Sequence, residues 1–387
     1  MVYSNPLCRG RHTHGGTLDP PTAEERTPTM PTLRRTLMVP LAAAAVVLAC
    51  AGTAAAQPTN STPAFNSLTT AANPAWMGQV ADSTSLAALS IPGTHDTLAI
   101  EGGLLPSAYE AQQDEGTSAQ TLTAQLDAGI RAIDIRVRIV NNGTAFAIHH
   151  TDVYEDANFD DVLTKAQAFL SANPSETIVM DLHGECDGDT TEGGIGFSIP
   201  GKCADEPSNA TTAMRESIFQ SYVARYPGLF YAPSVTGSST ADMPTLGQVR
   251  GHIVLSTFTG PVGEVYAGYG LTQLTTGNWG QYVENNWSQC DLAGKWGIAQ
   301  TNIQHAAADP ANMYTTYLSA NCAPFGAGPA DMAGGYNGGV GENQQALSYL
   351  SSGSVGASGV VLMDYPGYAL INAIIGLNSG VTPSAAS

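Results

Sequence analysis

Short apolar segments alternate with helix-like segments from about residue 85 to the end of the chain. Most of the apolar segments are continuous, which is typical of strands buried on both faces of a parallel sheet. Strand and helix in regular alternation over about 300 residues predict an α/β fold. We therefore expect a single (β/α)8-type TIM barrel, distorted or incompletely closed, with long rim loops at the Gly-rich stretches 260–280 and 326–341.

Apolar periodicity, together with Gly and Pro at the ends, sets the expected boundaries of these elements. The clearest helix is Asp160–Ala172, whose apolar residues fall on one face and which Asn173-Pro174 ends. The expected strands are Ala87–Ile91, Ala132–Ile139, Thr144–Ile148, Ile178–Leu182, Gly251–Phe258, Met313–Ala320 and Gly359–Met363. The other expected helices are Thr121–Ala128, Thr211–Tyr226, Glu342–Leu350 and Tyr368–Ile375.

Chemically versatile side chains lie on or just after several of the expected strands. They are His95 and Asp96, Asp134 and Arg136, His149 and His150, and finally Asp364. In a β/α barrel the active site lies at the carboxyl ends of the strands, and the first and last strands are neighbours. We therefore expect His95 and Asp364 to lie side by side although they are far apart in the sequence. Asp134 and Arg136 are two residues apart on a strand and should face the same side.

The amino-terminal part of the chain is expected to lie outside the barrel. Residues 1–29 are polar and are interpreted as a disordered or untranslated extension. Residues 30–56 have the basic start, short apolar core and small-residue cleavage site of a secretory signal peptide, so a secreted protein is expected. A lipid anchor at Cys50 is the alternative. Residues 57–80 are expected to be a linker, and 81–387 the barrel.

Charge narrows the expected partners. Residues 1–56 hold five of the 14 Lys and Arg residues and three of the 33 acidic residues, so removing them changes the formal charge from −19 to −21. Such a surface repels nucleic acid and anionic membranes at long range and is typical of a soluble exported protein.

Four cysteines lie beyond the expected leader. In an exported chain an even number indicates disulfides, and the simplest of three pairings joins Cys186 to Cys203 and Cys290 to Cys322. A zinc site is the rival interpretation, although no Cys-x-x-Cys motif occurs.

Several motifs in order carry a family resemblance. They are the runs Ser90–Thr97, Gln125–Arg136, Ile148–His150, Phe169–Ile178 and Leu362–Tyr365. Together they resemble the X region of phosphatidylinositol-specific phospholipase C, and most closely its bacterial-type, metal-independent branch.

The resemblance implies acid–base roles for two histidines. His95 matches the general base that takes the proton from the inositol 2-hydroxyl, and Asp364 matches the carboxylate that orients it. His150 matches the general acid, assisted by Asp96. His149 is expected to be a packing residue.

The resemblance also implies a role for a cation. Arg136 matches the side chain that binds the phosphate, and Asp134 its support. In calcium-dependent relatives an acidic residue takes the position of Arg136, so we expect no required metal and no cofactor. The position of His183 carries Lys in metal-independent bacterial members, and His183 is expected to contact substrate.

The residues expected to read the headgroup differ from the family pattern. An Arg of the bacterial enzymes corresponds to Phe258 here, and an acid and a Tyr correspond to Asn285 and Trp287. Trp287 can still stack on a sugar ring. These differences leave open a glycosylated inositol lipid or another phosphodiester.

The leading hypothesis is a secreted, monomeric phosphodiesterase that acts on phospholipid at a membrane surface and yields diacylglycerol and a cyclic inositol phosphate. One alternative is a metal-dependent barrel phosphodiesterase for another headgroup. The other is an inactive barrel that binds inositol lipids or glycans. No nucleic-acid partner is expected.

Overall fold

The computed structural model describes residues 57–103, 105–140, 143–151, 153–185, 211–232, 243–256 and 281–383. All of them belong to one compact unit, Ala51–Ser387. The strands are β1 Ile91–Thr94, β2 Ala132–Ile139, β3 Phe146–His150, β4 Val153–Asn158, β5 Ile178–Gly184, β6 Ile253–Leu255, β7 Gln281–Glu284, β8 Met313–Tyr317 and β9 Val360–Met363. The helices are α1 Pro106–Tyr109, α2 Ser118–Ala128, α3 Phe159–Ala172, α4 Thr212–Arg225, α6 Leu246–Val249, α7 Leu292–Ala308, α8 Pro329–Gly334, α9 Glu342–Leu350 and α10 Tyr368–Ile375. Three short 3-10 helices, η1 Leu68–Thr70, η2 Trp76–Gln79 and η3 Leu86–Ala88, precede β1.

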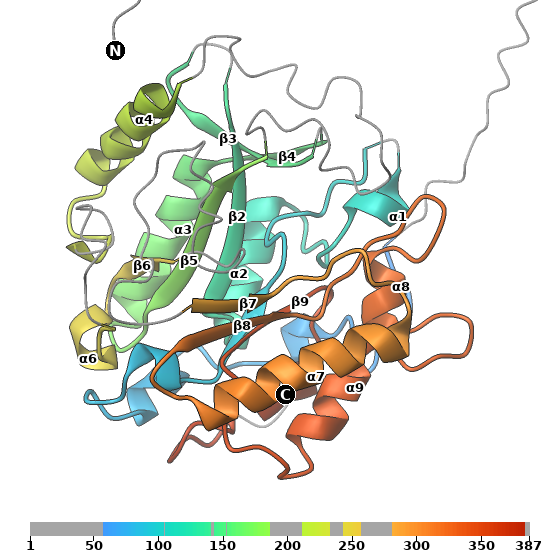
Figure 1. Ribbon diagram of the computed structural model, residues 1–387. Helices are drawn as coiled ribbons and strands as arrows, with labels where there is room; N and C mark the ends of the chain where they lie inside the picture. Colours follow the sequence, from blue (N-terminus) through green and yellow to red (C-terminus); the bar gives the residue numbers. More distant parts are fainter. Residues whose placement is uncertain are drawn as a thin grey trace, which may run out of the picture. The chain divides into compact units, whose positions relative to one another are not determined.

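The strands form one curled sheet with helices packed around it (Figure 1). Seven described strands run parallel in the order β7-β8-β9-β1-β2-β5-β6. Within the described ranges β6 and β7 are the two ends of this path, so the ring of hydrogen bonds stays open between them. The predicted parallel α/β architecture, incompletely closed, is confirmed.

Close packing fixes the first strand between its neighbours. A Cβ added to Gly93 would lie 2.5 Å from Leu362 Cδ2 on β9 and 2.7 Å from Ala132 Cβ on β2. The glycine of the Pro92-Gly93 pair therefore lets β9 and β2 approach β1 from both sides. This approach brings the carboxyl ends of the three strands together, where the candidate site lies.

Two expected strands differ from the structure. The segment predicted as the strand Ala87–Ile91 overlaps the end of η3, and β1 begins only at Ile91, because tertiary pairing with β9 decides the strand boundary. The strand expected at Thr144–Ile148 is β3, which pairs antiparallel with the carboxyl half of β2. Its partner β4 was not predicted, because its sequence is rich in polar residues. The β3–β4 hairpin thus extends the sheet beside the barrel instead of contributing a barrel strand.

The segment 57–80, expected as a linker, packs into the main core. Trp76 and Met77 are only 2% and 0% exposed, and the Trp76 indole Nε1 donates to the carbonyl of Gly129 at 2.9 Å. The linker prediction was wrong because the Ser, Thr, Asn and Pro composition outweighed a few large apolar residues. In the stretch 326–341, expected as a rim loop, the structure has α8. The predictions for residues 1–56 and 260–280 concern residues outside the described ranges.

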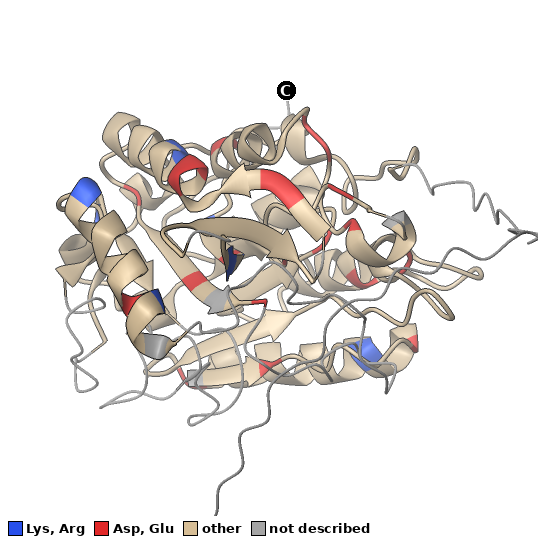
Figure 2. Ribbon diagram, turned by 90° about the horizontal axis from the view of Figure 1, so that it is seen from above, with Lys and Arg blue, Asp and Glu red and all other residues tan. Residues whose placement is uncertain are grey.

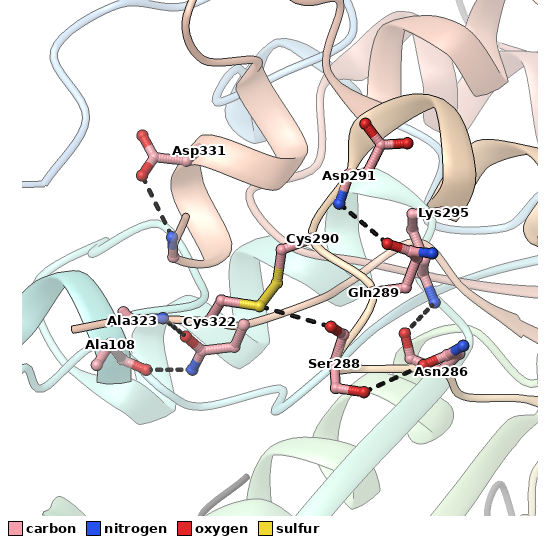
Figure 3. Close-up of a disulfide and its surroundings, with 12 residues drawn as sticks. Ala108, Asn286, Ser288, Gln289, Cys290, Asp291, Lys295, Cys322, Ala323 and Asp331 are labelled. Carbon is pink, nitrogen blue, oxygen red and sulfur yellow. Dashed lines mark hydrogen bonds between the residues drawn. A yellow bond between two sulfur atoms is a disulfide. The ribbon is translucent and has the colours of Figure 1, made fainter. Parts of the chain in front are cut away.

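The predicted pairing of Cys290 with Cys322 is confirmed by a disulfide that joins the β7–α7 loop to the β8–α8 loop (Figure 3). Cys186 and Cys203 lie outside the described residues. Acidic segments are spread widely over the described ribbon and basic ones are few (Figure 2). Among the described residues, no helix combines the length and apolar character that crossing a bilayer requires.

Candidate active site

The first acid–base pair lies where β1 and β9 end. The register pairs Thr94 with Met363, so the next residues, His95 and Asp364, are neighbours. His95 Nδ1 lies 2.8 Å from Asp364 Oδ1, and the carboxylate is buried. The backbone N–H of His95 also donates to the Met363 carbonyl at 3.1 Å. The predicted adjacency of His95 and Asp364 is therefore confirmed.

The second pair joins the end of β1 to the hairpin. His150 Nε2 lies 3.0 Å from Asp96 Oδ2, and His150 Nδ1 lies 2.8 Å from the carbonyl oxygen of Tyr109 in α1. A carbonyl can only accept, so Nδ1 carries a hydrogen and Nε2 faces the carboxyl group. A single proton between Asp96 and His150 therefore satisfies both groups.

The backbone at Asp96 explains how adjacent residues serve different partners. Its φ is +46°, in the left-handed region that Asp tolerates better than most residues. The Asp96 N–H donates to Asp134 Oδ2 at 3.1 Å, which holds this turn. His95 thus pairs with Asp364 while Asp96 pairs with His150.

Arg136 is surrounded by three carboxyl groups. Its Nη1 lies 3.2 Å from Asp96 Oδ2 and 3.0 Å from Glu185 Oε1, and its Nη2 lies 3.0 Å from Asp134 Oδ2. The Arg136 side chain remains 15% exposed. It is fixed in orientation yet reachable, as a phosphate-binding cation needs to be. Asp134 and Arg136 face the same side of β2, as predicted.

Burial shapes the ionisation of this cluster. It raises the pKa of Asp96 to about 7, against the opposing effect of Arg136. It also lowers the pKa of His150. Burial alone lowers the pKa of Arg136, but the three carboxylates outweigh it and the pKa lies well above its ordinary value. The site thus combines a permanent cation with a carboxyl–imidazole pair that shares a proton near neutral pH.

The residues predicted to bind substrate are not all joined to this cluster. His183 pairs in register with Arg136 on the neighbouring β5. Asn285 and Trp287 lie in the loop after β7, where Trp287 is 39% exposed. Phe258 lies outside the described residues. His149, expected to pack, is buried with its ring centroid 5.5 Å from that of Tyr154.

Sequence reasoning missed two participants. Glu185 follows β5, and its carboxylate contacts both Arg136 and the backbone N–H of Thr151, the latter at 3.2 Å. Its signal was an acid just after an apolar strand, the same signal that identified Asp364. Tyr109 contributes its backbone carbonyl and a ring that packs edge-on against His150, with ring centroids 5.7 Å apart, and no periodic pattern could have indicated it.

The described residues contain no group of three or more His, Cys, Asp or Glu side chains arranged to hold a metal ion. Around Arg136 the carboxylates that a cation would need are already paired with the guanidinium. The expectation of metal independence stays a prediction.

Comparison with known proteins matches this arrangement to one family. The family model described as phosphatidylinositol-specific phospholipase C, X domain, matches residues 90–194. The chain is 30% identical over 314 residues to a 1-phosphatidylinositol phosphodiesterase of Listeria monocytogenes, covering 81% of this chain and 86% of the relative. It is 25% identical over 311 residues to the protein of that name from Staphylococcus aureus strain Newman, covering 76% and 88%.

Solved structures agree with the fold. The phosphatidylinositol-specific phospholipase C from Listeria monocytogenes aligns with a TM-score of 0.59 at 26% identity, over 80% of this chain and 99% of that one. A double mutant of the Staphylococcus aureus phospholipase aligns with a TM-score of 0.58 at 21% identity, over 81% and 99%. The second match shows the fold alone, and both support the predicted barrel.

Proposed function

The chain belongs to the phosphatidylinositol-specific phospholipase C family, and from this premise we propose that it cleaves the glycerol–phosphate bond of phosphatidylinositol-type lipids. The observation that carries the proposal is the arrangement of two separate histidine–carboxyl pairs, His95–Asp364 and His150–Asp96, around the partly exposed Arg136. A base, an acid and a phosphate-binding cation within one site are the groups that a phosphodiester cleavage requires.

In the proposed first half of the reaction, His95 Nε2 takes the proton from the inositol 2-hydroxyl, and that oxygen bonds to phosphorus. Asp364 holds Nδ1–H at 2.8 Å, so that Nε2 is the free basic nitrogen. The buried carboxylate also stabilises the imidazolium that forms. Proton transfer and bond formation thus begin on the β1–β9 side.

In the other half, the bond between phosphorus and the glycerol oxygen breaks. The proton shared by His150 and Asp96 goes to that oxygen and releases diacylglycerol. The phosphate is left as a cyclic inositol phosphate, so the reaction is that of a lyase. Arg136 donates to the non-bridging phosphate oxygens, where negative charge grows in the transition state.

The proposed substrate is presented by a membrane surface. Three large apolar side chains on the rim segments are exposed: Leu105 before α1 by 40%, Trp287 after β7 by 39% and Phe325 after β8 by 82%. Exposed apolar residues close to a site are typical of proteins that contact lipid. We propose that the protein is exported through the leader at residues 30–56 and acts as a monomer at such a surface.

The proposal is tested with residues 57–387, by phosphorus NMR of phosphatidylinositol micelles with excess chelator. A cyclic inositol phosphate signal is the expected result and would also establish metal independence. Product only after addition of calcium would place the enzyme among metal-dependent phosphodiesterases. Absence of product under both conditions, with the lipid still bound, would support the inactive binding barrel.

A further inference from the structure

The short helix α1 lies between the candidate general acid and a disulfide-linked part of the rim. The carbonyl of Tyr109 accepts from His150 Nδ1 at 2.8 Å. The preceding carbonyl, that of Ala108, accepts from Asn321 Nδ2 at 2.8 Å. Two consecutive carbonyls of α1 therefore accept hydrogen bonds from two different parts of the molecule, one from the candidate acid and one from the rim.

Asn321 is itself held at every polar group of its side chain. Its Oδ1 accepts from the backbone N–H of Ala323 at 3.0 Å. In addition, the backbone N–H of Asn321 donates to the Trp287 carbonyl at 2.9 Å. The next residue, Cys322, is bonded to Cys290 in the loop after β7 (Figure 3). The disulfide thus fastens the β8–α8 loop, from which Asn321 reaches α1, to the β7–α7 loop.

The helix α1 depends on such contacts for its position. It has four residues, too few to be stable by its own hydrogen bonds. Gly328, on the far side of the same loop, packs so closely that an added Cβ would overlap the carbonyl oxygen of Ser107. The β8–α8 loop therefore fixes α1 both by close packing and by the Asn321 amide.

We propose that Asn321, held in place by the Cys290–Cys322 disulfide, is a positioning residue for the general acid His150. The inference rests on the proposed function, because it concerns the acid step of that reaction. The Tyr109 carbonyl keeps the hydrogen of the imidazole on Nδ1, which leaves Nε2 to exchange its proton with Asp96 and the leaving oxygen. If α1 shifts, this carbonyl moves with it and the orientation of the acid is lost.

The test uses two soluble inositol phosphodiesters that differ only in the leaving group, one an alkyl alcohol and the other a nitrophenol. An alkoxide needs the proton of the acid, whereas a nitrophenolate departs without it. The variant Asn321→Asp keeps the acceptor for Ala323 but loses the donor to Ala108. We expect kcat/KM for the alkyl substrate to fall about 10-fold, which is less than the ~10²–10⁴-fold contribution of the acid itself. The value for the nitrophenyl substrate should change little.

Asn337→Asp is the matched control, because Asn337 is exposed beyond α8 and the same substitution there adds the same charge. It should leave both rates unchanged. Equal losses on both substrates in Asn321→Asp, or no loss on either, would overturn the inference. A wild-type protein that cleaves neither soluble diester nor phosphatidylinositol would instead overturn the proposed function, so the two failures are distinguishable.

The contribution of the disulfide is tested by the double substitution Cys290→Ser, Cys322→Ser in the same assay. It avoids reductants, which would act on every disulfide of the chain. We expect a selective loss on the alkyl substrate that is smaller than that of Asn321→Asp, because the amide contact can still form in part of the molecules. Unchanged selectivity between the two substrates would contradict the role given to the disulfide.

Discussion

The base side and the acid side of the site are built in different ways. His95 and Asp364 are successors of residues that are already paired in register on two parallel barrel strands. His150 lies on the antiparallel β3, and its orientation depends on the four-residue α1. The base pair is therefore fixed by the sheet itself, while the acid pair depends on contacts between segments around it. Substitutions elsewhere in the molecule should therefore disturb the orientation of the acid, His150, before they disturb that of the base, His95.

The largest expected effects come from removing either histidine. His95→Ala should lower kcat by about 10²–10⁴-fold with any leaving group, because no other group takes the proton from the nucleophile. His150→Ala should lower it by a similar factor with an alkyl leaving group and far less with nitrophenol. Steady-state rates on both soluble diesters measure this difference. Equal sensitivity of the two variants to the leaving group would break the division into a base side and an acid side.

The cation between the two sides should come next. Arg136→Lys keeps the charge but cannot span Asp134 and Glu185 at 3.0 Å while presenting two donors to phosphate. We expect kcat/KM to fall about 100-fold, as for loss of one donor to a developing charge. The fall should be alike for both leaving groups. A selective fall with the alkyl substrate would show that Arg136 acts mainly through the acid.

The acid side should also make folding stability depend on pH. Glu155 on β4 accepts from the backbone N–H groups of Ile100 and Glu101, both at 2.9 Å, just after the active-site turn. Burial raises its pKa to about 9 from an ordinary value of 4.5. The folded state then holds a proton that the unfolded state releases, so stability falls as the pH rises from about 4.5 through about 9.

Glu155→Gln should make this pH dependence weaker, because the amide stays neutral at every pH. Denaturant midpoints measured at about pH 5, 7 and 9 give the slope of stability against pH for each protein. The wild-type midpoint should drop with pH more steeply than that of the variant. Parallel slopes would show that Glu155 is ionised in the folded protein.

The smallest effect is expected on the base side. Asn343 at the start of α9 donates from Nδ2 to the carbonyls of Asp364 and Tyr365, at 2.9 and 3.3 Å. Asn343→Ala should cost about 1 kcal/mol of stability and change both substrates equally, since β1 and β9 still hold the pair. Thermal unfolding and the two-substrate assay test this. A loss of activity that is selective for one leaving group would contradict the expected difference between Asn343 and Asn321.

The barrel side of the site could be predicted because strand pattern and topology determine it. Parallel strands carry their carboxyl ends to one edge, so His95, Asp364 and Arg136 could be placed together from sequence. On the acid side the sequence predicted which residues take part, but not the contacts that orient them. Tyr109 contacts His150 through its backbone carbonyl and its ring, whereas Asn321 acts through a loop contact far away in the chain. Neither leaves a periodic signal.

The carboxylates around Arg136 have a consequence for selectivity among phosphates. The guanidinium offers one positive charge, while the carboxylates of Asp134 and Glu185 each lie 3.0 Å from it. A singly charged diester needs one cation, but a doubly charged monoester would meet strong repulsion. Inorganic phosphate and phosphorylated sugars should therefore bind weakly at this site. A cyclic product that has been hydrolysed to a monoester should not inhibit cleavage of the lipid.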